Sequence, residues 1–241
     1  MVNNFKSKDE FLEGAVILID KPLGWTSFDA VNKVKSLLKY RLGLKKIKVG
    51  HAGTLDPMAT GLLVICTGKM TKQIQYIQAD EKGYTGQFKF GVTTVSFDRE
   101  ADETEFFPTE HLSLQFLQEK ALGFEPGYDQ MPPQFSARKV DGQRAYLAAR
   151  KGKNVELTSN FVEIRDFKLY DYNLPFVNFD VTCSKGTYIR SLAFDLGVAA
   201  NSGAYLTGLR RYRSGNYHVD DAFTLESLET WMNAFAESTN A

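Results

Sequence analysis

Residues Gly50–Thr67 read GHAGTLDPMATGLLVICT, a glycine-rich loop that runs directly into an apolar strand. The glycines of this loop permit positive φ angles and a close approach of the backbone to a ligand. Pro57 holds Asp56 out of the helical region and fixes the turn that follows. A carboxylate on a rigid loop before a buried strand suits general-base or nucleophilic chemistry. Because Asp-Pro is also a common turn former, the loop alone leaves a purely structural role open.

The segments around this loop are interspersed strands and helices. Strands are expected at Gly14–Asp20, Leu62–Thr67, Tyr84–Gly91, Asn154–Leu157, Val162–Tyr172 and Val177–Ser184. Helices are expected after a cap at Ser27, near Met70–Ile77, from a cap at Thr109 toward Leu122, at Gln143–Lys151, at Tyr188–Ala199 and near Leu225–Phe235. The absence of a regular βαβ rhythm predicts an α+β fold with a mainly antiparallel sheet. We expect one catalytic domain over residues 11–235, preceded by a polar tail at residues 1–10.

Composition excludes several classes of protein. With 43% hydrophobic and 24% charged residues, the 241-residue chain is close to the average globular protein. No apolar run approaches the roughly 20 residues that span a bilayer, and no signal segment is seen at the N-terminus. Cys66 and Cys183 lie in apolar runs without a neighbouring cluster of metal ligands. We therefore expect a cytoplasmic protein with no membrane association and no zinc site.

The net charge of zero conceals an uneven distribution of charge. Residues Lys33–Lys48 contain seven basic residues and no acidic one, whereas Asp98–Glu110 contains six acidic residues and one arginine. A zero net charge argues against a strongly basic nucleic-acid binder. Basic segments that converge on one face would nevertheless attract a polyanion such as RNA. Each run taken alone is also compatible with an ordinary solvated face.

Three further residues are candidates for a site. His51 could act as a base or contact a phosphate, although a lone loop histidine is often structural. Arg190 opens a predicted helix and could keep Asp56 ionised if the two were close; alternatively, it is a surface arginine paired with Asp195 or solvent. Tyr84 begins a strand between two glycines and could stack on a nucleobase or pack in the core. The chain has no Walker A loop, dinucleotide-binding fingerprint, nucleophile elbow or deaminase signature.

Taken together and in order, several segments resemble the TruB family of tRNA pseudouridine synthases. The resemblance lies in Gly14–Pro22 (GAVILIDKP), Gly50–Gly61 (GHAGTLDPMATG), Lys82–Tyr84, Gln130–Arg150 (QMPPQFSARKVDGQRAYLAAR), Cys183–Gly197 (CSKGTYIRSLAFDLG) and Leu209–Arg211. It extends from about residue 11 to residue 228. Several long motifs in the family's order make a chance match improbable.

This resemblance implies a pseudouridine-synthase fold, with a central mainly antiparallel sheet, flanking helices and a catalytic cleft across the sheet. The implied reaction converts uridine 55, in the T-loop of tRNA, to pseudouridine without a cofactor or metal. By the family's motifs, Asp56 would be the nucleophile, Tyr84 would stack on the flipped base and Arg190 would pair with Asp56. The implied substrate-binding residues are His51, Lys21, Leu209, Gly53 and Thr54.

The basic segments would then hold the phosphates of the tRNA while the base is flipped out. Residues 128–153 resemble the family's RNA-gripping insertion. The expected RNA-binding residues are Lys45, Lys46, Lys48, Arg138, Lys139, Arg144, Arg150, Arg210 and Arg211. We expect a monomer with no obligate protein partner.

Two departures from the family pattern and two alternatives remain. We expect no C-terminal PUA domain in this sequence, which fits either a minimal branch of the family or a truncated chain, so RNA binding would rest on the catalytic domain. Phe135 stands where the family would have a tyrosine. The alternatives are a tRNA-binding or tRNA-folding module without catalysis, and a synthase of the same fold that acts on another RNA.

Overall fold

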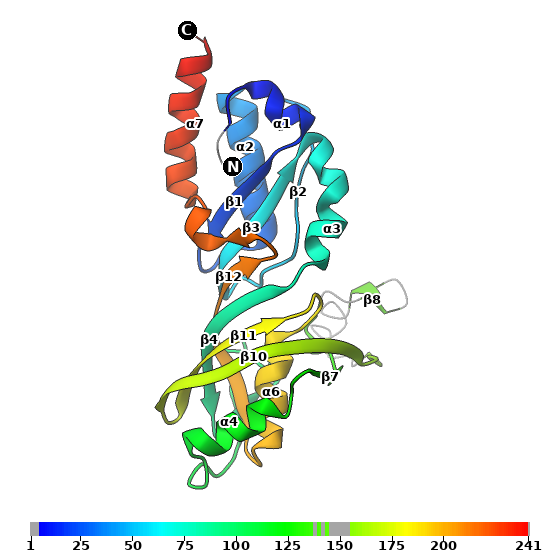
Figure 1. Ribbon diagram of the computed structural model, residues 1–241, viewed down its shortest axis with the longest axis vertical. Helices are drawn as coiled ribbons and strands as arrows, with labels where there is room; N and C mark the ends of the chain where they lie inside the picture. Colours follow the sequence, from blue (N-terminus) through cyan, green and yellow to red (C-terminus); the bar gives the residue numbers. More distant parts are fainter. Residues whose placement is uncertain (1–4, 137–138, 141–142, 145–154, 241) are drawn as a thin grey trace. The chain divides into compact units, whose positions relative to one another are not determined.

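The computed structural model describes residues 5–136, 139–140, 143–144 and 155–240. They form two compact units (Figure 1). Unit 1 comprises residues 1–84 and 210–241, and unit 2 comprises residues 85–209. Strands β4 (Lys82–Phe90) and β12 (Ala204–Ser214) have residues in both units. All the larger strands belong to one nine-stranded sheet.

The remaining elements of unit 1 are α1 (Lys8–Gly14), β1 (Val16–Lys21), α2 (Ser27–Arg41), β2 (Val49–His51), β3 (Ala59–Thr67), the 3-10 helix η1 (Gly68–Gln73), α3 (Ile74–Ala79), β13 (Tyr217–His218), the 3-10 helix η2 (Val219–Asp221) and α7 (Leu225–Asn240). Strand β3 pairs antiparallel with both β1 and β2, and β12 pairs antiparallel with β13. Helices α2 and α7 pack against each other (Figure 1).

The core of unit 1 follows from the apolar runs of β1 and β3. Successive side chains of a strand point to opposite faces of the sheet. Ile17 and Ile19 of β1 accordingly pack in a cluster with α2 and α7, whereas Leu18 packs in a second cluster with Ala52 and Val219. Because both faces are covered, these strands are continuously apolar rather than alternating.

Unit 2 adds β5 (Val92–Thr94), β6 (Glu103–Phe106), α4 (Leu114–Leu122), β7 (Gly127–Gln130), β8 (Lys139–Val140), β9 (Gln143–Arg144), β10 (Asn160–Asn173), β11 (Phe176–Cys183) and α6 (Ile189–Ala199). Strand β10 pairs antiparallel with β7 and β11. An aromatic group lies in its core: the rings of Phe88 and Phe179 are stacked with centroids 4.1 Å apart, and Phe167 meets Phe88 edge-on.

The α+β fold with its central sheet confirms the expected fold class. Some local expectations are wrong. Thr26, not Ser27, caps α2, because its hydroxyl accepts a hydrogen bond from the Asp29 amide at 3.0 Å and the Asp29 carboxylate binds the Thr26 amide in return. Ser113, not Thr109, caps α4.

Three other segments also differ from expectation. Gln143 and Arg144 lie in a strand rather than at the start of a helix, and the rest of that expected helix lies outside the described residues. Residues 155–157 form no regular strand. Residues 5–10 are not simply a polar tail, because α1 begins at Lys8 and the Phe5 ring packs 4.6 Å from that of Phe11.

Candidate active site

Asp56 lies in the loop at residues 52–58, between β2 and β3 of unit 1. The preceding residue, Leu55, is held by a single side chain: the hydroxyl of Ser27 accepts from the Leu55 amide at 2.8 Å and donates to the Leu55 carbonyl at 3.0 Å. On the other side of Asp56, the Pro57 carbonyl accepts from the Gly24 amide at 2.8 Å. Asp56 is therefore partly exposed on a backbone that is fixed on both sides.

The same loop closes over a buried arginine. Arg211 of β12 has 1% of its surface exposed, and its guanidinium donates to the carbonyls of Leu62 at 2.8 Å and Gly53 at 3.1 Å. Gly53 has φ +107° and Gly61 has φ +101°, and a Cβ atom at Gly61 would overlap the Arg211 carbonyl oxygen. The expectation that Arg211 contacts RNA is wrong, because its side chain supports the loop from inside.

Lys21, at the end of β1, is fully buried beside this loop. Its ammonium group donates to the carbonyls of Pro22 at 3.0 Å and Trp25 at 2.6 Å, in the turn before α2. Burial lowers the pKa of Lys21 to about 8; the charge of Asp56 opposes this shift, and the charge of Arg211 adds to it. The charges of Asp56 and Arg211 therefore both affect the pKa of the Lys21 ammonium group.

His51 ends β2, immediately before the loop, and is half-buried. Burial lowers the pKa of His51, the charge of Arg211 adds to this effect, and a hydrogen bond with the Gly53 backbone opposes it. A histidine with a lowered pKa is neutral at pH 7. His51 can therefore serve as a hydrogen-bonding group rather than a cation. Thr54, also in the loop, is exposed.

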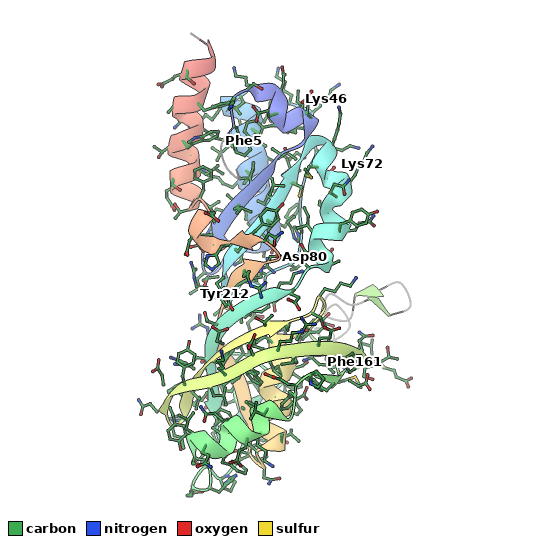
Figure 2. The ribbon with its side chains drawn as sticks, in the orientation of Figure 1. Phe5, Lys46, Lys72, Asp80, Phe161 and Tyr212 are labelled. Atoms are coloured by element: carbon green, nitrogen blue, oxygen red, sulfur yellow. The ribbon has the colours of Figure 1, made fainter. Side chains whose placement is uncertain are left out.

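Tyr84 lies on β4, with 8% of its surface exposed. Its neighbour Gly83 lies against Tyr212 of β12, since a Cβ atom at Gly83 would overlap the Tyr212 ring. Figure 2 marks Tyr212 in unit 1. The glycine preceding Tyr84 is thus required by close packing, which explains one of the two glycines that flank this tyrosine.

Arg190 belongs to unit 2, in the first turn of α6. It is 8% exposed, and its Nε atom lies 3.5 Å from a carboxylate oxygen of Asp98. It also donates to the carbonyls of Ser96 at 3.2 Å and Phe135 at 3.0 Å. A surface position beside Asp195 is therefore wrong. Pairing with Asp56, a residue of unit 1, stays a prediction.

Sequence reasoning missed Asp98. It is 5% exposed, and its carboxylate accepts from the Ser96 hydroxyl at 2.5 Å and the Glu100 amide at 2.9 Å. In the sequence it is the first acid of a charged run and resembles a solvated residue. Only the fold shows that this acid lies beside Arg190. Leu209, by contrast, is a partly exposed residue of β12.

The expected RNA-binding residues have different environments. Lys45, Lys46 and Lys48 are exposed, and no ion pair is found for them among the described residues. Arg210 binds Asp20 through both guanidinium nitrogens, at 3.0 and 2.7 Å. Arg138 and Arg150 lie outside the described residues. So do the side chains of Lys139 and Arg144, whose backbones form part of β8 and β9.

The expected basic run after Lys33 is partly neutralised. Lys33 lies 2.6 Å and Arg41 3.4 Å from the carboxylate of Glu229 on α7. Lys69 and Lys72, both exposed, follow Gly68, whose amide donates to the Lys48 carbonyl at 2.9 Å. Figure 2 shows Lys46 and Lys72 on the same side of unit 1 in this view.

In the described part of the chain, no three His, Cys, Asp or Glu side chains gather in a way that could hold a metal ion. No helix within the described ranges is both long enough and apolar enough to cross a membrane.

Residues 39–189 match the family model described as TruB family pseudouridylate synthase (N-terminal domain), and residues 190–240 match that of the tRNA pseudouridylate synthase B C-terminal domain. The chain belongs to the TruB family. A tRNA pseudouridine synthase B of Flavobacterium johnsoniae is 52% identical over 92% of this chain and 97% of its own length. That of Phocaeicola vulgatus is 50% identical over 92% of this chain and 95% of its own length. This TruB protein is thus an enzyme that isomerises uridine to pseudouridine in tRNA.

Solved structures agree with the TruB assignment. The chain is similar to one in the crystal structure of a Cbf5-Nop10-Gar1 complex, with a TM-score of 0.71 and 27% identity over 97% of this chain and 59% of that one. It is also similar to a chain in the structure of an H/ACA RNP bound to a substrate RNA containing 2'-deoxyuridine, with a TM-score of 0.68 and 26% identity over 97% of this chain and 58% of that one. The chain thus spans less than two thirds of these solved relatives.

Proposed function

We propose that the enzyme acts on uridine 55 in the T-loop of tRNA, with Asp56 as the nucleophile. The observation that carries this proposal is the fixed loop around Asp56, with Leu55 bound twice by Ser27 and Pro57 bound by Gly24. A reacting carboxylate must be held within about 0.5 Å of its productive position. A loop that served only as a turn would not need anchors on both sides of its aspartate.

The reaction itself requires a group that retains the detached base. The C1′–N1 bond of uridine breaks, the uracil turns, and a C1′–C5 bond forms; C5 then loses its proton, and N1 gains one. The Asp56 carboxylate holds either the sugar or the base covalently while the uracil turns. No electron donor or second substrate is needed, because the product is an isomer of the starting nucleoside.

The other residues are assigned by the TruB motifs. Tyr84 stacks on the flipped base from a buried strand position, and Arg190 acts as the cationic partner of Asp56. His51, Leu209 and Thr54 line the place where the substrate binds, whereas the buried Lys21 and Gly53 support the loop from inside. The lowered pKa of His51 supports a role as a neutral contact to the nucleotide.

Phosphate contacts are assigned to the exposed lysines of unit 1. Lys45, Lys46 and Lys48 precede β2, which leads into the Asp56 loop, and Lys69 and Lys72 are further exposed lysines of the same unit. Free ammonium groups are the side chains that release counterions when they bind RNA phosphates. Arg210, already bound to Asp20, would contribute less. Arg138, Lys139, Arg144 and Arg150, within the insertion at residues 128–153, are assigned from sequence alone.

The protein is further proposed to act as a monomer, without an obligate protein partner, in the cytoplasm. All the residues assigned to the reaction come from one chain, so no second copy is needed to supply them. The cytoplasm is where a bacterial tRNA is available for modification.

The test is Asp56→Asn, assayed by tritium release from a tRNA transcript labelled at C5 of uridine. Pseudouridine formation should fall by roughly 10⁴-fold or more, because the amide cannot act as the nucleophile. Binding of tRNA should change by less than about threefold, because the shape of the loop is retained. The exposed Asp80→Asn, in the same unit, serves as the control and should keep full activity. Turnover retained by Asp56→Asn would contradict the proposal.

The position of modification is tested separately. Mapping pseudouridine in total RNA from a strain that lacks the gene should show a loss confined to position 55 of tRNAs. Loss at a different RNA would favour the alternative synthase, whereas binding of tRNA without any turnover by the wild type would favour the non-catalytic module.

A further inference from the structure

The helix that carries Arg190 begins without a side-chain cap of its own. Its N-cap residue is Tyr188, and the Tyr188 side chain accepts no hydrogen bond from the first turn. Free amides in a first turn leave a helix end prone to fraying. Arg190 lies in this turn, so any displacement of the helix start would move its guanidinium. A buried arginine therefore depends on a helix end that must be held from outside.

Gln130, the last residue of β7, supplies that support. Its side-chain oxygen accepts from the Tyr188 amide at 2.7 Å, and its side-chain nitrogen donates to the Tyr188 carbonyl at 3.1 Å. One amide side chain thus pairs with both backbone groups of the N-cap residue, as a neighbouring strand would. The donor at Tyr188 fixes which end of the Gln130 amide is the oxygen. Gln130 is 2% exposed, so water does not compete for these bonds.

The orientation of Gln130 is itself fixed by a chain of hydrogen bonds. Its nitrogen also donates to the hydroxyl of Tyr128 at 2.7 Å, and that hydroxyl donates to the carboxylate of Asp195 at 2.7 Å. Asp195 lies on α6, beyond the first turn. The hydrogen bonds therefore connect Tyr188, at the start of α6, to Asp195, further along the same helix, through Gln130 and Tyr128. Two turns of α6 are thereby bonded to one strand.

The segment after β7 continues the same contact. The Met131 carbonyl accepts from the Ser191 hydroxyl at 2.7 Å, and the Phe135 carbonyl accepts from Arg190 itself at 3.0 Å. Both contacts follow the bonds of Gln130 along the chain, since Met131 and Phe135 come after Gln130, and Arg190 and Ser191 come after Tyr188. Among them, only the two bonds from Gln130 act on the N-cap residue. Removing Gln130 would thus free the helix start while leaving the direct partners of Arg190 in place.

We propose that Gln130 is a positioning residue for the reaction, which sets the place of Arg190 by fixing the start of α6. This inference rests on the proposed function, in which Arg190 takes part in the reaction. The hydrogen bonds of Gln130 go to Tyr188 and Tyr128, so its proposed action on the reaction passes through the helix start. Its effect should therefore appear in the rate of the chemical step and not in tRNA binding, because a small misplacement of a reacting group can cost about 100-fold in rate.

The test compares two substitutions at Gln130 with a control. Gln130→Ala removes all three bonds, and Gln130→Glu keeps the size and the acceptor for the Tyr188 amide but removes both donors. The control is Gln87→Ala: Gln87 is a partly buried amide in unit 2 that bonds to Asn178 at 3.0 Å and to Thr207 at 3.2 Å. The single-turnover rate on a tRNA transcript should fall roughly 30- to 100-fold in both Gln130 variants, with the Kd for tRNA within about threefold. In Gln87→Ala, the rate should stay within about threefold of the wild type.

Two further measurements separate positioning from a general loss of stability. In an Arg190→Lys background, Gln130→Ala should cost less than about threefold in rate, because its effect passes through the missing guanidinium. Hydrogen exchange of the amides of residues 188–192 should accelerate in Gln130→Ala and stay unchanged in Gln87→Ala. This exchange reports on the helix even if no variant is active.

The outcomes are distinguishable. If the wild type forms no pseudouridine at position 55, the proposed function fails, and the exchange experiment still decides whether Gln130 holds the helix. If the wild type is active but Gln130→Ala keeps its rate, the positioning role is overturned. Equal rate losses in Gln130→Ala and Gln87→Ala, fully multiplicative losses in the Arg190→Lys background, or unchanged exchange at residues 188–192 would overturn it as well.

Discussion

Arg190 in unit 2 and Arg211 in unit 1 are both almost inaccessible to solvent, but their partners differ in kind. Arg190 lies 3.5 Å from the buried carboxylate of Asp98 and donates to the carbonyls of Ser96 and Phe135. Arg211 donates to the carbonyls of Leu62 and Gly53. The charge of Arg190 is thus opposed by an acid at close range, whereas the described bonds of Arg211 are to neutral groups.

The partners of a buried cation determine how strongly its charge changes the pKa of neighbouring groups. Carbonyl partners carry no net charge, so they do not cancel the positive charge of the arginine that they bind. Arg211 accordingly contributes to the lowered pKa values of Lys21 and His51. It thereby adds positive potential near the loop of Asp56. A cation paired with a buried acid has a weaker field, but it is costly to separate from that acid.

The largest effect should come from replacing the two arginines in turn. Arg190→Met leaves the buried Asp98 carboxylate without its cation and should lower the free energy of unfolding by about 3–5 kcal/mol. Arg211→Met leaves only carbonyls without a donor and should cost about 1–3 kcal/mol. Urea unfolding of both variants measures this difference. Adding Asp98→Asn to Arg190→Met should restore part of the loss. A greater loss of unfolding free energy in Arg211→Met than in Arg190→Met would contradict this difference between the two arginines.

A smaller effect should come from the glycines that surround Arg211. Gly61→Ala would force a Cβ atom into the Arg211 backbone at a positive φ, and we expect a loss of about 2–4 kcal/mol. At Gly53 the new Cβ atom would lie 3.4 Å from the guanidinium, so the loss should be about 1–3 kcal/mol. Gly24→Ala is the matched control, because Gly24 has φ +82° but nothing within 4 Å of an added Cβ atom. If thermal melts gave equal losses of stability for Gly24→Ala and Gly61→Ala, backbone strain alone, and not close packing on Arg211, would explain the loss of stability.

The smallest effect concerns the charge of Lys21. The pKa of Lys21 falls from 10.5 in the unfolded chain to about 8 in the folded protein. Between these values the unfolded state binds more protons, so the free energy of unfolding should rise with pH between about 8 and 10.5. Lys21→Met should abolish this rise, as measured by urea unfolding at pH 7.5, 9 and 10.5.

The same pH series also distinguishes the effects of the two arginines on the pKa of Lys21. Arg211→Met should move the start of the rise to higher pH, because it removes a charge that lowers the pKa of Lys21. Arg190→Met should shift the rise less, because the charge of Arg190 is opposed by Asp98. A pH series that responded equally to both substitutions would contradict the view that Arg211 acts more strongly than Arg190 on the pKa of Lys21.

Sequence patterns predict the elements that bury continuous apolar faces. Strands β1 and β3 and helices α2, α6 and α7 lie close to their expected positions because their apolar residues recur at strand or helix spacing. Strand β12 was not expected. Its second half contains three arginines, and the one that is buried, Arg211, resembles a surface cation in the sequence.

The candidate site also contains residues that the sequence predicts and residues that only the fold reveals. Asp56 and its loop are predictable, because glycines, proline and an acid lie within a few residues of one another. The supports of the loop are not predictable, since Ser27 offers an ordinary helix-capping signal while its hydroxyl in fact binds Leu55. Asp98 and Gln130 escape notice for a similar reason. Their roles arise from partners that are 92 and 58 residues away along the chain.

The loop at residues 52–58 receives its supports at different times during synthesis. Ser27 precedes Leu55 by 28 residues, whereas Arg211 follows Gly53 by 158 residues. At about 5–20 residues per second, a ribosome takes roughly 10–30 s to make the intervening chain. Until then the carbonyls of Gly53 and Leu62 lack their donor, so the loop that presents Asp56 stays unfinished on the nascent chain. The loop therefore gains all its described supports only after β12 has been synthesised.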